Sequence, residues 1–277
     1  MNCSRRRFIS GTASMGIGQV AGIGLAGQPS ETDGRSPVTR RELDEIRKGM
    51  TNGRHLTCVR TPESNDGPYY YPSSPTRRNI TEGHKGMRLR LGITVASANI
   101  PGSACAALRG AVVDVWQADA DGMYSNVGSD LQAVDTVGQT FMRGHQPTNR
   151  DGYVEFETVV PGWELLARAP PAKAVVRATH IHVKVFHENK VLTTQLYLPD
   201  DFLDGLYASV DPYRSHRTMT APGMENSVQR KRNVDDGAFV RDQSKPLEVH
   251  REGNGIVAQA TIGVVTLGSL GVRSLFR

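Results

Sequence analysis

Short segments with apolar residues at every second position recur along this chain of 277 residues. In the first of them, Leu89, Leu91, Ile93 and Val95 alternate with polar or small residues, a pattern typical of a strand with one buried face. No long helical pattern separates these segments, so the sequence predicts an all-β fold, an antiparallel β-sandwich with long loops. The other expected strands lie at residues 111–116, 153–159, 179–186, 191–198 and 256–267.

Turn residues and charge support this interpretation. The 29 glycines and 15 prolines fit many short connections, and turns are expected at residues 149–152 and 188–190. The net charge of +5 includes three arginines near the N-terminus. Without that segment the charge falls to about +2, which is too small to indicate a nucleic-acid partner.

The first thirty residues are predicted to be a signal peptide for export. A short basic stretch is followed by an uncharged, glycine-rich, mildly apolar one. Arg5, Arg6 and Phe8 lie in a segment that resembles the twin-arginine consensus, which is read by a receptor that exports folded proteins. The twin-arginine export machinery is therefore an expected partner, and the mature protein is expected to be periplasmic or secreted.

Residues 31–56 form a polar segment in which Leu43, Ile46 and Met50 have helical spacing, so a short N-terminal helix is expected there. Residues 57–277 are assigned to the sandwich domain. Within it, residues 199–245 are polar and lack periodic apolar positions, which predicts an irregular excursion. The basic run at 230–232 is interpreted as part of a solvated loop rather than an anion-binding patch.

Two cysteines remain once Cys3 leaves with the signal peptide. Export would expose Cys58 and Cys105 to an oxidising compartment, where they could form a disulfide. The alternative is a pair of buried free thiols.

The strongest chemical feature is the pair His180 and His182. Side chains two apart on a strand point to the same face, so both imidazoles can bind one metal ion. Ile181, Val183 and Val185 then lie on the opposite face and pack into the core. An isolated His-x-His pair could equally be two partly exposed histidines on a polar face.

Several segments in order decide between these alternatives, because together they resemble the intradiol ring-cleavage dioxygenases, especially the exported single-chain branch. The resemblance extends from about residue 57 to 206. It rests on residues 61–63, 67–70, 108–125, 141–144, 151–156, 161–163, 180–182 and 193–197.

The resemblance implies a mononuclear non-haem ferric site with two tyrosinate and two histidine ligands. Tyr124, in the turn from Asp119 to Ser125, matches the first tyrosine, and His180 and His182 match the histidines. Phenolate is a hard anionic donor that favours Fe(III). Where the family has its second tyrosine, after the Pro-Gly-Trp turn, this chain has Glu164.

Three interpretations of Glu164 stay open. It can replace the phenolate as an anionic oxygen ligand of Fe(III). It can form a two-histidine, one-carboxylate set better suited to Fe(II), with Tyr124 nearby but loosely bound. It can also be a surface residue of a site that binds metal weakly or no longer catalyses the reaction.

The resemblance also implies roles for two substrate-handling residues. Arg177 occupies the place of the cation that orients the substrate and stabilises its developing charge, and Gln195 resembles its polar companion. The expected function is an exported enzyme that cleaves a catechol-type aromatic 1,2-diol with O2. The alternative is a non-catalytic extracytoplasmic sandwich that binds a metal or an aromatic ligand. The sequence does not specify an oligomeric state.

Overall fold

The computed structural model describes residues 59–98, 105–132, 134–166, 175–216 and 230–266, all within one unit of the chain, residues 55–277. The predicted signal peptide, the expected helix in residues 31–56 and Cys58 lie outside the described residues. Cys105 is disulfide-bonded, which excludes a free thiol at this position. Of the helices described, none is long and apolar enough to span a membrane.

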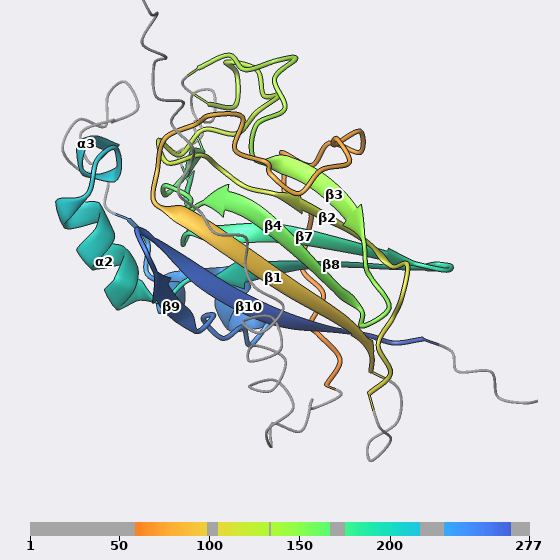
Figure 1. Cartoon of the computed structure of the whole chain (residues 1–277). Helices are drawn as coiled ribbons and strands as arrows, with labels where there is room; N and C mark the ends of the chain where they lie inside the picture. The colour runs from red at the N-terminus through yellow and green to blue at the C-terminus, as the bar shows by residue number, and fades with distance from the viewer. Residues whose placement is uncertain (1–58, 99–104, 133, 167–174, 217–229, 267–277) are drawn as a thin grey trace, which may run out of the picture. The chain divides into compact units, whose positions relative to one another are not determined.

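Two four-stranded sheets form a sandwich, which confirms the predicted fold class (Figure 1). The first sheet has the order β4-β1-β10-β9 and the second has the order β3-β2-β7-β8, while β5 and β6 form a separate two-stranded ribbon. The strands are β1 (Arg88–Ser97), β2 (Val112–Trp116), β3 (Arg143–Pro147), β4 (Tyr153–Val159), β5 (Leu165–Leu166), β6 (Val175–Val176), β7 (His180–His187), β8 (Lys190–Tyr197), β9 (Val249–Glu252) and β10 (Gly255–Val264).

Pairing within the sheets is antiparallel except between β1 and β10, which run parallel from the pair Leu89 and Ile256 to the pair Ser97 and Val264. The expectation of a wholly antiparallel sandwich is therefore wrong at this one pair. Parallel neighbours need a long connection. Here the connection is most of the domain, since β1 is its first strand and β10 its last.

All six strands expected from alternating apolar residues are present, whereas the short ribbon strands β5 and β6 were not expected, and neither were β3 and β9 of the two main sheets. β3 and β9 both lie at the edge of a sheet. Edge strands often carry charged residues or proline, which discourage pairing with another chain. The sequence of β3, Arg-Gly-His-Gln-Pro, and that of β9, Val-His-Arg-Glu, accordingly lack a clear alternation.

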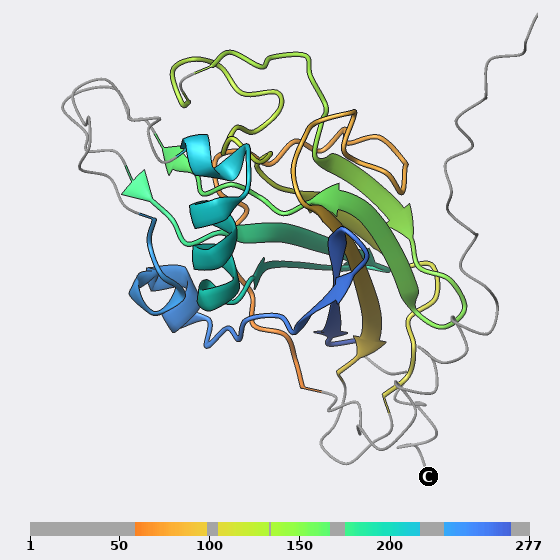
Figure 2. The same cartoon turned by 60° about the vertical axis from the view of Figure 1, so that its left-hand side comes forward.

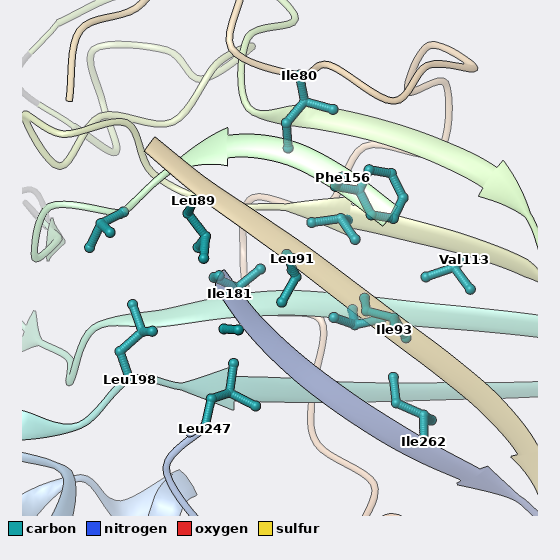
Figure 3. Packing of buried hydrophobic residues seen from close by; sticks show 14 of the residues in the cluster. Ile80, Leu89, Leu91, Ile93, Val113, Phe156, Ile181, Leu198, Leu247 and Ile262 are labelled. Atoms are coloured by element: carbon teal, nitrogen blue, oxygen red, sulfur yellow. The ribbon is translucent and has the colours of Figure 1, made fainter. Parts of the chain in front are cut away.

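The core fills the space between the two sheets (Figure 3). Leu91 and Ile93 from β1 and Ile181 from β7 are fully buried there, together with Phe156 from β4. Burying apolar surface of this kind contributes roughly 25 cal/mol for each Å² removed from water. The core thereby fixes which face of β7 points inward.

Both expected turns are present. The side chain of Asn149 accepts hydrogen bonds from the backbone N–H groups of Asp151 and Tyr153, each at 2.9 Å. Gly152 has φ of +70°, a conformation that favours glycine. Glu188, between β7 and β8, has φ of +50°. The second turn joins β7 directly to β8 and so sets the register of the two strands that carry His180, His182 and Gln195.

Residues 199–245 are not an irregular excursion, because four helical elements form in their described part. They gather at one end of the sandwich (Figure 2). The first one buries Leu203, Leu206 and Tyr207 against the rest of the domain. The elements are α2 (Asp200–Ser209), α3 (Tyr213–His216), η1 (Asn233–Asp235) and α4 (Gly237–Arg241).

The basic run is paired with α2 and is only partly solvated, since the side chain of Arg232 remains 45% exposed. Arg230, whose side chain is 8% exposed, binds Asp200 at 2.5 Å and also contacts Asp204. Arg232 contacts Asp204 at 2.6 Å. The expectation of a solvated loop is wrong for Arg230, because the acidic side chains of α2 that pair with it lie about thirty residues away in the sequence, beyond the reach of a local pattern.

Candidate metal centre

The candidate centre is built on β7, between β2 and β8 in the second sheet. His180 and His182 share the face of the sheet that points away from the core, and each is 3% exposed. Ile181, Val183 and Val185 belong to the core cluster on the other face. The predicted alternation is confirmed, and it holds both imidazoles on a strand that is hydrogen-bonded along both edges.

The two imidazoles converge through the same ring atom. Nε2 of His180 lies 3.0 Å from Nε2 of His182. Because a carbonyl oxygen can only accept, Nδ1–H of His180 donates to the oxygen of Ala178 at 2.6 Å, which leaves a lone pair on Nε2. Two nitrogens bound at about 2.1 Å and at right angles to one metal ion would also lie about 3.0 Å apart. The spacing therefore fits two adjacent ligands.

Neighbouring rings and backbone fix the orientation of His182. Trp116 of β2 lies directly across from it and stacks on its imidazole, with ring centroids 4.7 Å apart and planes 7° from parallel. Gly67 approaches from the other side, and a methyl group added there would lie 3.4 Å from Cε1 of His182. Sequence reasoning assigned Trp116 no role. Its role depends on the register across β2 and β7, which the sequence does not specify.

Tyr124 enters the site from a tightly bonded turn after β2. The side chain of Asp119 accepts hydrogen bonds from the backbone N–H groups of Asp121 and Met123, at 3.0 and 2.9 Å. Gly122 has φ of +81°, which closes the turn. Tyr124 is 2% exposed. The turn therefore aims a buried phenol at the histidines.

A second set of contacts fixes the backbone of Tyr124. The side chain of Gln132 accepts from the N–H of Tyr124 at 2.9 Å and donates to its carbonyl oxygen at 2.8 Å. Arg143 holds the next residue in place, because its Nη2 donates a hydrogen bond to the carbonyl oxygen of Ser125 at 2.6 Å. Gln132 has no sequence signal, since its role depends on how the loop folds back.

Glu164 follows the Pro-Gly-Trp turn after β4 and lies beside the other candidate ligands. It is 6% exposed, so it is not a surface residue. Its Oε1 lies 4.0 Å from Nε2 of His180, and its carboxylate is close enough to the hydroxyl of Tyr124 to raise the pKa of that phenol. Among the described residues its Oε2 has no hydrogen-bond partner. A buried carboxylate oxygen without a partner is costly unless a cation or donor occupies the site.

The turns that carry Tyr124 and Glu164 touch at Gly162. Its N–H donates to the carbonyl oxygen of Asp119 at 2.8 Å. A methyl group added to Gly162 would lie 2.3 Å from the carbonyl oxygen of Ala120. Only glycine allows this close approach. The Pro-Gly-Trp turn therefore brings the side chains of Tyr124 and Glu164, the two oxygen ligands of the candidate set, close together.

Burial dominates the electrostatics of the centre. It raises the pKa of Tyr124 well above its ordinary value, and the nearby Glu164 carboxylate adds to this. Burial also lowers the pKa of His180. It lowers the pKa of His182 well below the ordinary value, and the neighbouring His180 adds to this because two imidazolium charges would repel each other. Without a cation, the site therefore holds neutral imidazoles and a neutral phenol.

The residues that the resemblance assigned to substrate handling lie next to the centre. Nη2 of Arg177 donates to Oε1 of Gln195 at 2.9 Å. Gln195 on β8 lies directly across from His182 on β7. Arg177 directly follows β6, whose partner β5 begins after Glu164. The six residues chosen from the sequence thus lie in one neighbourhood.

The donor set suits ferric iron. Imidazole nitrogens bind iron, and anionic tyrosinate and carboxylate oxygens favour the hard ferric ion. Within the described residues, no three histidine, cysteine, aspartate or glutamate side chains form a group arranged to hold a metal. His180, His182 and Glu164 alone are therefore not close enough together to form such a group, and the candidate set needs Tyr124 as a fourth donor; the partnerless oxygen of Glu164 has no competing donor among the described residues.

Residues 65–230 match a family model described as Dioxygenase, which covers more than half of the chain. The chain belongs to the intradiol ring-cleavage dioxygenase family. Proteins of this family use non-haem ferric iron.

Curated relatives in this family are distant. Chlorocatechol 1,2-dioxygenase of Pseudomonas putida is 26% identical over 145 residues, which are 47% of this chain and 51% of that protein. Chlorocatechol 1,2-dioxygenase of Rhodococcus opacus is 24% identical over 173 residues, which are 58% of this chain and 63% of that protein. The chain therefore spans less than two thirds of the length of these relatives.

Solved structures show the same fold. An intradiol ring-cleavage dioxygenase from Tetranychus urticae has a TM-score of 0.60 at 23% identity, covering 76% of this chain and 97% of that one. The dioxygenase domain of a dioxygenase carbohydrate-binding protein fusion from Streptomyces sp. SirexAA-E has a TM-score of 0.50 at 28% identity, covering 75% and 99%.

The contact at Gly162 generates a prediction. Gly162→Ala should push the turns of Tyr124 and Glu164 apart and destabilise the protein by about 1–3 kcal/mol, a typical cost of overpacking. Iron content after gel filtration should fall as well. Gly205→Ala in α2, where nothing lies within 4 Å of the added methyl group, is the matched control. It should keep iron and stabilise the protein by up to about 1 kcal/mol. Unchanged iron content and urea midpoint in Gly162→Ala would contradict the proposed contact.

Proposed function

We propose that this chain binds one ferric ion through His180, His182, Tyr124 and Glu164 and uses O2 to cleave a catechol-type diol between its hydroxyl-bearing carbons. One observation carries the proposal. The two Nε2 atoms lie 3.0 Å apart, beside a buried phenol and a buried carboxylate that contact each other. Family membership supplies the reaction class, and the relatives named as chlorocatechol dioxygenases support a single aromatic ring as substrate.

When bound, ferric iron supplies the positive charge that holds a catecholate through its oxygens and makes the ring reactive toward O2. The protein's own residues do the rest. Arg177, whose guanidinium contacts Gln195, directs N–H donors toward negative charge that develops on the ring. The aromatic walls formed by Trp116 and by the stacked pair Tyr69 and Tyr124 keep water away from the centre.

Glu164 has a second role in this proposal. A catechol must lose protons as it binds, and the protein needs an acceptor for them. Oε2 of Glu164 is buried and has no partner in the described part of the chain, so it can take a proton without breaking an existing hydrogen bond. Glu164 would then serve as an anionic ligand before the catechol binds and as the acceptor of one of its two protons, after which the neutral carboxyl group would no longer be an anionic ligand; the second proton would pass to solvent.

Oxygen uptake tests the reaction. Iron-loaded protein should consume O2 when catechol or a chlorinated catechol is added. With isotopically labelled O2, both atoms should appear in the ring-opened dicarboxylate. His182→Ala, which removes a ligand from the rigid strand, should lose both iron and uptake. If the wild-type protein binds iron but consumes no O2 with any catechol, the proposal fails and the non-catalytic binding function takes its place.

We also propose that the protein is exported as a folded chain to the periplasm or beyond. The support is the segment around Arg5 and Arg6, which resembles the twin-arginine consensus, and the disulfide at Cys105, which suits an oxidising compartment.

Replacing both Arg5 and Arg6 by lysine should leave folded precursor in the cytoplasm of a bacterium that has twin-arginine transport, as measured by fractionation and immunoblotting. Arg7→Lys keeps the pair and is the matched control, which should be exported normally. Export of the double variant at the wild-type level would exclude this route.

A further inference from the structure

Asp236 is a completely buried carboxylate next to the candidate centre, and the residues matched by the family model end before it. It lies between η1 and α4, in the segment that the sequence suggested was irregular. A fully buried charge is costly unless it is paired and hydrogen-bonded. The groups that pair with this carboxylate therefore indicate its role.

Each carboxylate oxygen of Asp236 binds Arg177. Oδ2 accepts from Nε of Arg177 at 2.7 Å, and Oδ1 accepts from Nη2 at 3.1 Å. The same Nη2 donates to Gln195 on β8 and to the hydroxyl of Tyr197, at 2.9 and 3.3 Å. The guanidinium is thus held between a helix terminus and a strand, which fixes its plane.

The same carboxylate also orients the start of β7. Oδ2 of Asp236 accepts from the backbone N–H of Ala178 at 3.0 Å. The carbonyl oxygen of Ala178 in turn accepts from Nδ1–H of His180 at 2.6 Å. Asp236 is therefore linked to His180 by hydrogen bonds through the backbone of Ala178. The hydrogen bond at Nδ1 of His180 keeps the proton on that nitrogen, which leaves Nε2 free to bind a metal.

Charge agrees with this geometry. Burial opposes ionisation of Asp236, but the contacts with Arg177 outweigh it and lower the pKa of the carboxyl group to about 2. Burial also opposes the charge on Arg177, and Asp236 again prevails, so the pKa of the guanidinium is raised. Both groups are ionised at neutral pH.

We propose that Asp236 is a positioning residue of the centre, which aims the Arg177 guanidinium at the substrate and holds His180 in the tautomer that binds metal. This inference rests on the proposed function for the role of Arg177. Its effect on His180 is independent of that function. The helical end of the domain thereby becomes part of the active centre rather than a peripheral addition.

Asp236→Asn is the informative variant, because it separates two roles of the residue. Oδ1 also caps α4 by accepting from the N–H groups of Ala238 and Phe239. An asparagine oxygen can keep this cap, but the amide NH2 must then face the Nε–H of Arg177 and the N–H of Ala178, which are both donors. Asp242→Asn is the matched control, since Asp242 is also buried, lies at the other end of α4 and pairs with Arg241.

The first measurement needs neither iron nor substrate. In metal-free protein, nitrogen NMR of the imidazoles should show the His180 ring protonated at Nδ1. Asp236→Asn should shift the His180 signals or mix the tautomers, whereas Asp242→Asn should leave them unchanged. Identical His180 spectra in wild type and Asp236→Asn would overturn the claim for His180, whether or not the protein proves to be a dioxygenase.

The second measurement uses turnover per bound iron. Asp236→Asn should lower kcat for catechol roughly tenfold or more, with a smaller change in KM, because a misplaced donor mainly affects developing charge. Adding Asp236→Asn to Arg177→Gln should lower kcat by much less than Asp236→Asn does alone, since Arg177 is already absent and only the effect through His180 remains. An additional loss of the same size in the double variant would overturn positioning through Arg177. If Asp236→Asn alone does not fold, the double variant replaces it, because the double variant no longer contains the buried Arg177 cation without its partner. The kcat of the double variant is then compared with that of Arg177→Gln alone, and the same outcomes decide.

Discussion

The site depends on the alternation of side chains along β7. Ile181, Val183 and Val185 are fully buried in the core between the sheets, so His180 and His182 must share the opposite face. A slip of one residue in register would exchange the two sets and place imidazoles in an apolar core. The same burial that stabilises the sandwich therefore also fixes the spacing of the two nitrogens.

The remaining groups come to this strand from other parts of the same domain. Tyr124 and Glu164 arrive on turns that meet at Gly162, and Arg177 is anchored to the helical end by Asp236. Tyr124 and Arg177 are held by hydrogen bonds from residues other than the proposed ligands. Such support lets a site keep its geometry when one ligand type changes, as with Glu164 in the place of the family's second tyrosine.

Sequence patterns predicted those parts of the molecule whose structure depends on local periodicity. The strands with one buried face and the pairing of His180 with His182 on one side of β7 follow directly from a period of two. The partners Trp116, Gln132 and Asp236 could not be predicted, because their roles depend on register, on a loop folding back and on a helix far along the chain. The parallel pairing of β1 and β10 depends on the whole domain in the same way.

The visible spectrum of ferric-loaded protein tests the proposed ligand set most directly. One tyrosinate ligand, Tyr124, should give a charge-transfer band, which Tyr124→Phe should abolish. Glu164→Tyr should strengthen it by adding a second phenolate. Tyr153→Phe on β4, which removes a hydroxyl bonded to Glu155 in the other sheet, should leave it unchanged. A wild-type protein that binds about one equivalent of ferric iron yet stays colourless at every pH would show that Tyr124 is not a ligand and would contradict the account.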